Sequence, residues 1–435
     1  MSATISKILD SVILTHNSHR LLTSNSQFSF KKDLGTNICT LTLKEVARYY
    51  LQNGSKVYAS FLDATKAFDR VRFDKLFQLL LERQINPVDL RAMFCLYTKQ
   101  TSCTVWDGHF SQCFSSSNGI RQGGIISPVL YCVYVEELLN RLKLAGYGCW
   151  IGSYYLGAIC YADDMTLLSP SAHGLQCMIN ICEEFAIEYS MDYNVLKSVC
   201  MLFSKKSLNV ELPKIILSGR ELSWVSKVKH LGNYISGDLS EEPEIQFKRG
   251  DLVGRVNTLL ANCGGASDNT LMYIYSAQCS HMYGAQTWNF NDKNVQLYHT
   301  MWNRCARRLL DLPWRTHSRF LPALTGLKNS QEKAMSMFMT CVQTMSKCDN
   351  EICNFIVQRG IHNADSIIGS NLRQISRVTK LEVSKLLQQT YLPRMYTLTI
   401  DERCAIKCVN ELRTNEIDGY TEEERKTLMN FLLIS

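Results

Sequence analysis

Two adjacent aspartates, Asp163 and Asp164, interrupt an otherwise apolar stretch that reads CYADDMTLL over residues 160–168. Neighbouring carboxylates repel each other, and apolar surroundings disfavour the charge on both. The flanking segments YYLGAIC and MTLL favour strands, so Ala162, Asp163 and Asp164 are expected to form the tight turn of a β-hairpin. Only a turn can direct both carboxylates towards one point, because successive side chains of a strand alternate between faces. Taken alone, the pair also fits a solvated turn, in which aspartate is a favoured residue.

A third carboxylate changes the balance between these interpretations. The segment KVYASFLDA (56–64) favours a strand, carries Asp63 near its end and leads into a helical pattern. Mg²⁺ prefers oxygen ligands, typically one or two carboxylates together with substrate phosphates and water. Two such ions, about 3.5–4 Å apart, can assist an in-line phosphoryl transfer. The sequence therefore predicts a divalent-cation site for phosphate chemistry, built from two strand ends.

Strand and helix patterns alternate up to about residue 235 and become almost purely helical beyond about residue 240. Ser127 and Pro128 form a helix-start signal, and Ser169 and Pro170 form another. Apolar residues then recur with helical spacing between Leu175 and Tyr189, and SVCMLF (198–203) predicts a further strand. The expected fold class is α+β, with a mixed front part and an α-rich back part.

The composition is that of an ordinary globular protein, with 435 residues, 46% of them apolar and 20% charged. The net charge of +7 is compatible with a polyanionic partner. The 18 cysteines contain no C-x-x-C pair, which favours free thiols in a reducing compartment; the alternative is a metal site built from distant residues. Cys348 with Cys353 and Cys404 with Cys408 come nearest to ligand pairs, but no histidine follows them at zinc-knuckle spacing. No signal peptide and no apolar run of roughly 18 residues is present, so we expect an intracellular protein, cytoplasmic or nuclear, without a membrane span.

Five motifs in a fixed order give the chain a recognisable pattern. They are FLDATKAFDRV (61–71), GIRQGGIISPVLY (119–131), YADD (161–164), NVLKSVCMLF (194–203) and KHLGNYIS (229–236), preceded by SNSQFSFKK (24–32). This order resembles the reverse transcriptases of non-LTR, LINE-like retrotransposons. The resemblance implies a right-hand polymerase with an antiparallel palm sheet. It implies fingers and palm over residues 1–238, a helical thumb over 239–330 and a helical region of unknown role over 331–435.

The resemblance also assigns roles to individual residues. Asp63, Asp163 and Asp164 match the ligands of two Mg²⁺ ions, with Asp163 the more direct ligand of the pair. Lys197 matches a lysine that donates a proton to the departing pyrophosphate; its alternative is a solvated charge at a strand edge. Phe68 matches the steric gate that excludes a 2′-hydroxyl, and its alternative is an ordinary core position.

Further positions match regions that hold the substrates. Gln122 and Gly123 match the segment that lies along the incoming nucleotide and the template. Lys31 and Arg121 are candidates for binding the triphosphate, or ordinary surface charges. The segment from His230 through Leu231 to Gly232 matches the region that supports the primer end.

An arginine-rich segment, WNRCARRLLDLPWRTHSRF (302–320), is the strongest basic feature of the back part. Arg304, Arg307 and Arg308 alternate there with apolar residues, and three aromatic residues accompany them: Trp302, Trp314 and Phe320. Such a surface can track a phosphate backbone and stack on bases. The alternative is an amphipathic helix whose basic face is only hydrated.

The predicted reaction is the RNA-templated addition of dNTPs to the 3′-hydroxyl of a DNA primer. Ser29 stands where the family's fingers motif has glycine, which is expected to stiffen or shift that loop. No endonuclease segment precedes the motifs and no CCHC knuckle follows them, so we expect an N-terminally truncated element whose activity is open. One alternative is a catalytically inactive, nucleic-acid-binding remnant. Another is an RNA-dependent RNA polymerase, which would be expected to carry a smaller gate than Phe68 and a glycine in place of Ala162. The oligomeric state is not predicted.

Overall fold

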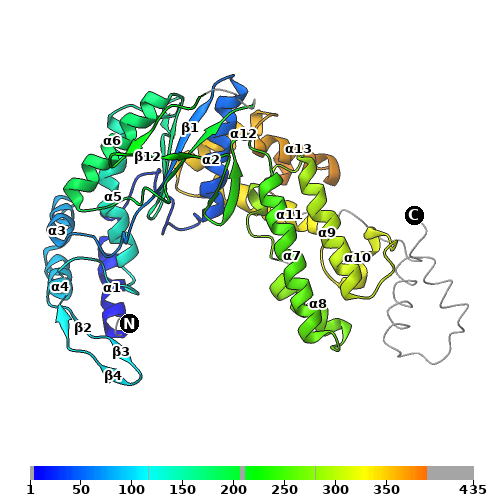
Figure 1. Ribbon diagram of the computed structural model, residues 1–435, viewed down its shortest axis with the longest axis horizontal. Coiled ribbons are helices and arrows are strands. Elements are labelled where there is room, and N and C mark those ends of the chain that lie inside the picture. The colour runs from blue at the N-terminus through cyan, green and yellow to red at the C-terminus, as the bar shows by residue number, and fades with distance from the viewer. Residues whose placement is uncertain (1–3, 116, 206–210, 280, 389–435) are drawn as a thin grey trace, which may run out of the picture. The chain divides into compact units, whose positions relative to one another are not determined.

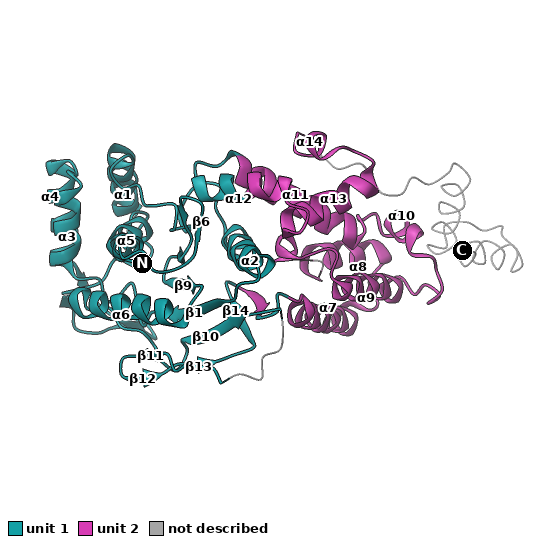
Figure 2. Ribbon diagram, turned by 90° about the horizontal axis from the view of Figure 1, so that it is seen from above, with its two compact units in different colours: residues 1–231, 237–239, 347–356 teal, residues 232–236, 240–346, 357–435 magenta. Residues whose placement is uncertain are grey.

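The computed structural model describes residues 4–115, 117–205, 211–279 and 281–388, which form two compact units (Figure 2). Unit 1 comprises residues 1–231, 237–239 and 347–356, and unit 2 comprises residues 232–236, 240–346 and 357–435, as far as these are described. Within the described residues, no helix combines the length and the apolar character needed to cross a bilayer.

The centre of unit 1 is a five-stranded sheet with the strand order β13-β10-β1-β9-β8. Its strands are β1 (Val57–Asp63), β8 (Ala158–Tyr161), β9 (Asp164–Ser169), β10 (Val199–Phe203) and β13 (Ser223–Trp224). The pairs β10–β1, β1–β9 and β9–β8 are antiparallel, whereas the short edge strand β13 runs parallel to β10. The predicted antiparallel sheet is therefore correct except at this edge.

Helices cover both faces of the sheet, with α5 and α6 on one side of β1 and α2 on the other (Figure 1). The helices that begin in unit 1 are α1 (Thr4–Asn17), α2 (Thr36–Gln52), α3 (Phe73–Glu82), α4 (Pro87–Thr98), α5 (Ser127–Leu144), α6 (Ala172–Tyr189) and α12 (Glu351–His362), the last of which continues into unit 2. The side chains of Leu62, Met165 and Cys160 lie in register across three strands and join the core formed with α5 and α6. Side chains one position further along each strand point to the opposite face, because side-chain direction alternates along a strand.

The remaining strands are short. They are β2 (Thr101–Ser102), β3 (Val105–Trp106), β4 (His109–Phe110), β5 (Phe114–Ser115), β6 (Trp150–Ile151), β7 (Tyr154–Tyr155), β11 (Ile216–Leu217), β12 (Arg220–Glu221), β14 (Lys227–His230) and β15 (Asn233–Ser236).

The described part of unit 2 contains one strand, β15, and is otherwise built from helices and the segments that connect them. Its helices are α7 (Glu242–Cys263), α8 (Asp268–Ile274), α9 (Lys293–Leu309), α10 (Leu321–Thr325), α11 (Ser330–Lys347), α13 (Ile367–Thr379) and α14 (Val383–Leu386), with shorter turns η1 (Tyr275–Cys279), η2 (Ala285–Thr287) and η3 (Ser318–Phe320). The long helices α7 and α9 pack side by side. On α9 the buried residues Tyr298, Trp302 and Leu309 recur with helical spacing, which leaves the arginines on the other face.

The structure confirms the α+β class and most predicted elements. The apolar stripe from Leu175 to Tyr189 is the buried face of α6, although this helix is capped by Ser171, whose hydroxyl accepts from Gly174 N, and not by Ser169. Beyond residue 240 the described residues are helical, as expected. The 16 cysteines in the described ranges are all free; Cys404 and Cys408 lie outside those ranges. Because compact units are not functional domains, the predicted division at residues 238 and 330 stays a prediction.

Candidate active site

The three aspartates come together at one end of the central sheet. Asp63 is the last residue of β1, Asp164 is the first residue of β9, and the two are directly opposed in the antiparallel register. Directly opposed residues of an antiparallel pair have Cα atoms about 4.5–5.5 Å apart. Asp163 immediately precedes Asp164, so the sheet places three carboxyl groups within a few residues of one strand end.

The β8–β9 connection is a two-residue turn made by Ala162 and Asp163, because Tyr161 and Asp164 still pair as strand residues. The expected three-residue turn is therefore wrong by one position. Ala162 has φ 59°, and a positive φ at the first turn residue alone is the pattern of a type II′ turn. Glycine is the usual residue there, and a residue with a Cβ atom costs about 1–2 kcal/mol in this conformation.

Two buried polar side chains of the fingers motif, Gln27 and Ser29, form hydrogen bonds with the backbone of this turn. The amide of Ala162 donates to Gln27 Oε1 at 3.1 Å and to Ser29 Oγ at 2.9 Å. Gln27 Oε1 also accepts from the amide (3.1 Å) and the hydroxyl (2.9 Å) of Ser29. Gln27 and Ser29 are 0% and 1% exposed, and Phe28 N donates to the carbonyl of Cys160 in β8. We call Gln27 and Ser29 the turn support.

The turn support explains the departure of Ser29 from glycine. The serine hydroxyl fills a buried position between the fingers motif and the hairpin, with Cys132 Sγ 3.3 Å away. These contacts agree with the expectation of a stiffer loop. A glycine at position 29 would lack the hydroxyl, and the Ala162 amide would then have only Gln27 Oε1 as its acceptor.

The electrostatics of the site reflect three crowded acids. The pKa of Asp164 is raised to about 6. Desolvation is the largest cause, and the negative charges of Asp163 and Asp63 contribute the rest. Desolvation also raises the pKa of Asp163, and the charge of Asp63 adds to it. Both side chains are nevertheless accessible to solvent, so the repulsion is partly screened. A cation at this strand end would relieve that repulsion.

The backbone of Asp63 is held on both sides by the NVLKS segment. Its carbonyl accepts from Asn194 N at 2.8 Å, and its amide donates to the buried hydroxyl of Ser198 at 3.1 Å. Lys197 lies in the same turn, and its Nζ is 3.9 Å from Asp63 Oδ2. Its side chain is 70% exposed, which leaves the ammonium free to move between the aspartate and a bound ligand.

Phe68 is half-buried and stacks on the buried Tyr131 of α5, with ring centroids 4.6 Å apart. Burial raises the pKa of the Tyr131 phenol, and Cys160 and Asp163 add to that shift, so the Phe68–Tyr131 stack lies beside the paired aspartates. Phe68 is therefore neither a fully buried core residue nor a loose surface ring. Its partial exposure beside the acids suits the predicted gate.

Gln122 and Gly123 are exposed in the loop before α5. Gln122 Nε2 is 3.4 Å from Asp69 Oδ1, which is a long contact. Gly123 has φ 79° and no atom within 4 Å of the place where a Cβ would be. This part of the loop therefore presents open backbone.

Lys31 and Arg121 already have structural partners. Lys31 Nζ donates to the carbonyls of Thr23 and Ser24, and burial lowers its pKa. The Arg121 guanidinium forms an ion pair with Asp10 of α1, in which the side chains are 9% and 1% exposed. Neither residue is therefore an ordinary surface charge. Their nucleotide-binding role stays a prediction.

The predicted primer region differs from the catalytic acids in its exposure. His230 is buried, contacts Thr166 Oγ1 at 3.2 Å through Nε2, and has a pKa lowered to about 4 by burial. It is therefore neutral near pH 7 and supports the sheet face, away from solvent. Leu231 and Gly232 follow with φ 48° and 79°, the two positive values of a type I′ turn.

The predicted basic surface lies in unit 2 on α9. Arg304 and Arg308 are exposed, and Arg307 is half-buried with its Nε donating to the carbonyl of Thr316 at 2.8 Å. Two of the aromatic residues expected to stack on bases cannot do so, because Trp302 and Phe320 are 4% and 0% exposed. The expectation that they stack on bases is therefore wrong for Trp302 and Phe320. Trp314 is 78% exposed, so its ring is accessible to a base.

The side chains at the strand end meet only some of the requirements of a metal site. Over the described ranges, no group of three or more His, Cys, Asp or Glu side chains has the arrangement of a metal cage. The donor set at the strand end still fits Mg²⁺ in its chemistry, because this ion is usually held by one or two carboxylates with substrate phosphates and water.

Residues 2–235 match the family described as reverse transcriptase (RNA-dependent DNA polymerase). The chain belongs to this family. The match spans the strand ends that carry Asp63, Asp163 and Asp164, and the whole of the predicted motif order. Members of the family generally use divalent metal ions.

Curated relatives confirm the resemblance to polymerases of non-LTR retrotransposons. The chain is 22% identical over 383 residues to the RNA-directed DNA polymerase from mobile element jockey of Drosophila melanogaster, covering 83% of this chain and 40% of that protein. It is 27% identical over 207 residues to the Pol polyprotein from the type-1 retrotransposable element R1 of Bradysia coprophila, covering 45% and 19%. The chain thus spans less than half the length of these relatives.

Among solved structures, the chain is similar to telomerase from Candida tropicalis in complex with a fragment of telomeric RNA, with 11% sequence identity and a TM-score of 0.40 over 91% of this chain and 57% of that one.

Several residues that build the site escaped prediction. Tyr131 ends a motif that was recognised, yet its role as the platform of Phe68 depends on the packing of α5. Ser198 carries no signal of its own in the sequence, and Gln27 was part of a motif without an assigned function. Their roles arise from contacts between segments that are far apart in the sequence: 63 residues separate Phe68 from Tyr131, and 135 residues separate both Asp63 from Ser198 and Gln27 from Ala162.

Proposed function

We propose that the chain is an RNA-directed DNA polymerase of a non-LTR retrotransposon, which adds dNTPs to a primer 3′-hydroxyl under the direction of an RNA template. The observation that carries the proposal is the register of Asp63 opposite Asp164, with Asp163 in the adjoining turn. Family membership and the curated relatives support the reaction class. In this proposal residues 1–238 supply fingers and palm, and residues 239–330 supply the thumb.

The reaction balances without any group beyond the two substrates and water. The primer 3′-hydroxyl loses its proton to water as its oxygen forms a bond to the α-phosphorus of the dNTP, the bond from that phosphorus to the bridging oxygen breaks, and pyrophosphate leaves. Asp63 and Asp163 would hold Mg²⁺ together with the phosphates, and Asp164 would contribute charge beside them. The bound ions would stabilise the attacking and leaving oxygens.

The chain's own residues have distinct parts in this scheme. Lys197, close to Asp63 and largely exposed, would deliver a proton to the departing pyrophosphate. Phe68, backed by Tyr131, would occupy the space of a 2′-hydroxyl. Gln122 and the open backbone at Gly123 would lie along the nucleotide. The turn from His230 to Gly232 would support the primer end.

A primer-extension assay tests the proposal. The full chain is incubated with a poly(rA) template, an oligo(dT) primer, dTTP and Mg²⁺. We expect extension by the unaltered chain and a loss of at least about 100-fold in Asp163→Asn, because a ligand of the reacting phosphates is removed. Asp107→Asn is the matched control, since Asp107 lies exposed in the β3–β4 turn.

The same assay separates the alternatives. Extension with UTP as readily as with dTTP indicates an RNA polymerase and contradicts the gate assigned to Phe68. Binding of primer–template without any extension indicates a nucleic-acid-binding remnant. Phe68→Ala should admit UTP about 10- to 100-fold better than the unaltered chain, since it removes the steric obstacle and not the acids.

A further inference from the structure

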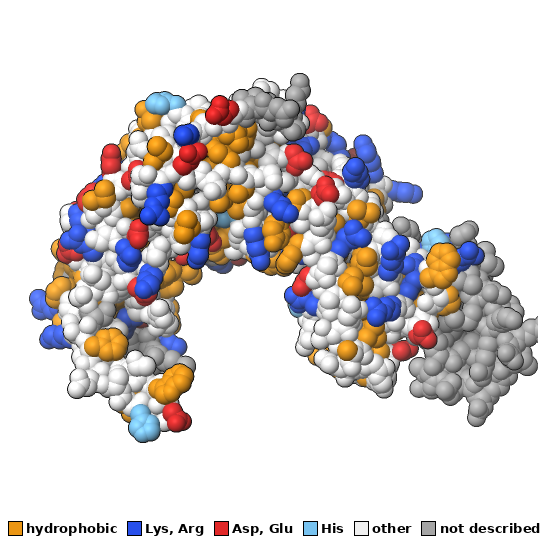
Figure 3. Space-filling view, viewed as in Figure 1, with side chains coloured by type: hydrophobic (Ala, Val, Ile, Leu, Met, Phe, Trp, Pro, Cys, Tyr) orange, Lys and Arg blue, Asp and Glu red, His pale blue; other side chains and the backbone are white. Residues whose placement is uncertain are grey.

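The exposed face of α9 borders a pocket of about 650 Å³ that lies entirely within unit 2. Its lining includes the guanidinium groups of Arg304, Arg307 and Arg308 and the indole of Trp314. A volume in this range is that of a small-molecule site. In Figure 3, Lys and Arg side chains gather over the region of α9.

Among the described residues, the positive charge of this pocket has no carboxylate beside it in an ion pair. None of its eight lining residues is acidic, and among the described residues none of its three arginines forms an ion pair with a carboxylate. Arg308 is bound only to the side-chain oxygen of Asn257, at 2.6 Å, and Arg307 only to a carbonyl. Burial lowers the pKa of Arg307, and the neighbouring Arg304 lowers it further, which reflects two like charges held close together.

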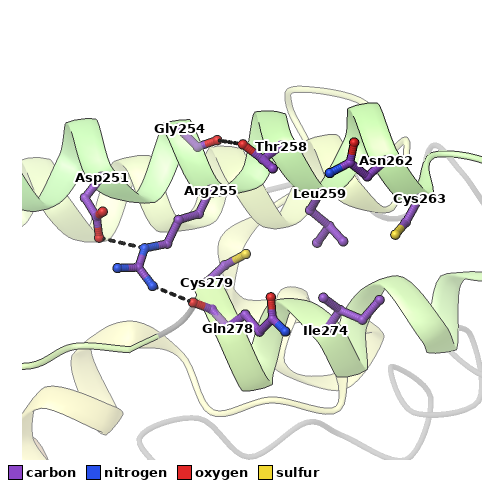
Figure 4. A pocket seen from close by; sticks show the side chains of 10 residues that line it. All are labelled: Asp251, Gly254, Arg255, Thr258, Leu259, Asn262, Cys263, Ile274, Gln278 and Cys279. Atoms are coloured by element: carbon purple, nitrogen blue, oxygen red, sulfur yellow. Dashed lines mark hydrogen bonds and ion pairs between the residues drawn. The ribbon is translucent and has the colours of Figure 1, made fainter. Parts of the chain in front are cut away.

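A neighbouring pocket in the same unit shows the contrasting case (Figure 4). It measures about 440 Å³ and lies between α7 and the segment that contains η1. Its single arginine, Arg255, donates to Asp251 Oδ2 and to the carbonyl of Gln278, both at 2.9 Å, so its charge is neutralised within the protein. In the part of the chain that the structure describes, no carboxylate pairs with the arginines of the α9 pocket in this way, so these guanidinium groups can accept an external anion.

An aromatic ring completes the α9 pocket. Trp314 is 78% exposed, and the Arg315 guanidinium lies 4.7 Å from its ring centroid, which orders the indole from one side. What sets this ring apart from other exposed rings is that it lines the same pocket as three arginines. A ring beside several arginines fits a nucleotide, whose phosphate and base need a cation and a stacking surface respectively.

We propose that this pocket binds single-stranded nucleic acid, with the phosphates held by Arg304, Arg307 and Arg308 and one base stacked on Trp314. A duplex fits less well, because its bases are already stacked on one another and cannot cover the indole. The inference deepens the proposed polymerase function, since it gives unit 2 a grip on unpaired template or displaced strand. It does not require that the chain polymerise.

The test is photo-crosslinking of a 12-nucleotide oligouridylate that contains 4-thiouridine to the full chain, with the attachment site mapped by mass spectrometry. We expect attachment at Trp314 or its immediate neighbours. The affinity of the unmodified, fluorescein-labelled oligomer is measured in parallel by anisotropy at several salt concentrations, and 12-nucleotide oligo(dT) and a duplex serve as comparison ligands.

Matched variants separate a built site from a merely hydrated basic face. Trp314→Ala should weaken binding on the order of tenfold, whereas Trp106→Ala, which removes an indole that is 82% exposed in unit 1, should not. Arg304→Gln should weaken binding and reduce the slope of log K against log salt by about 0.7. Arg377→Gln, in the last turn of α13, is the charge-matched control and should leave the slope unchanged.

Three results would overturn the inference: crosslinks only outside unit 2, equal effects of Arg304→Gln and Arg377→Gln, or a duplex that binds as tightly as the single strand. Circular dichroism tests whether each variant is folded. If Trp314→Ala does not fold, Arg304→Gln still tests the site, because Arg304 is exposed and its replacement leaves the core intact. Crosslinking to Trp314 without primer extension would reject the polymerase proposal and leave this site standing. Extension without that crosslink would do the reverse.

Discussion

The turn support beneath the paired aspartates makes a prediction whose size follows from its hydrogen bonds. Gln27→Met keeps the length of the side chain and removes the oxygen that accepts from Ser29 N, Ser29 Oγ and Ala162 N. Ala162 N keeps Ser29 Oγ as an acceptor, and the serine hydroxyl can turn towards Cys132. One buried donor, Ser29 N, is therefore left without a partner.

A buried donor without a hydrogen-bond acceptor lowers the free energy of unfolding by about 1–3 kcal/mol. We therefore expect Gln27→Met to reduce the free energy of unfolding by about 2 kcal/mol, which corresponds to a fall in Tm of about 4–8 °C for a unit of 150–250 residues. Because the turn positions Asp163, kcat for primer extension should fall while KM for dTTP changes little.

Thermal unfolding and steady-state extension measure the two effects. Gln78→Met is the control, because Gln78 is exposed on α3 and its amide contacts only Glu82 on the same helix. Ser29→Ala should show a smaller loss, about 1 kcal/mol, since the amide of Ala162 keeps Gln27 as its acceptor. Unchanged Tm and kcat in Gln27→Met would refute the reasoning that the fingers motif supports the turn.

Two further predictions follow from buried and crowded charges. Arg121→Met should lower the free energy of unfolding by about 3–5 kcal/mol, because it leaves the Asp10 carboxylate buried without its cation; a raised KM for dTTP at unchanged Tm would instead favour a nucleotide-binding role. Asp164, whose pKa is raised to about 6, makes the metal-free chain less stable as the pH rises from about 4 through 6, since the folded state holds that proton more tightly than the unfolded state does. In EDTA at pH 7.5, Asp164→Asn should therefore have an equal or higher Tm than the unaltered chain, and Mg²⁺ should raise the Tm of the unaltered chain more; a lower Tm for the variant would contradict the repulsion.

Local patterns predicted the elements that bear the catalytic acids. The strand ending at Asp63 and the hairpin carrying the paired aspartates were correct because alternation and turn chemistry act within a few residues. The turn was placed one residue too long, since its length depends on the register with β1 and β8, which no short window contains.

Predictions that depended on tertiary contacts were less complete. Trp302 and Phe320 have the same local signal as Trp314, yet their packing within unit 2 buries them and leaves only Trp314 at the surface. Arg121 and Lys31 read as free charges in the sequence, while Asp10 and the carbonyls of residues 23 and 24 already hold them. The parallel edge strand β13 is two residues long and carries too little pattern to be recognised.

The central claim is that the end of β1 and the β8–β9 turn share a divalent ion. Iron-mediated cleavage tests it most directly: Fe²⁺ replaces Mg²⁺ in the presence of primer–template and dTTP, ascorbate and hydrogen peroxide are added, and backbone cuts are mapped by mass spectrometry. We predict cuts next to Asp63 and next to Asp163 that disappear together in Asp163→Asn and persist in Asp107→Asn. Cuts confined to other parts of the chain, or cuts at these two places that survive Asp163→Asn, would contradict it.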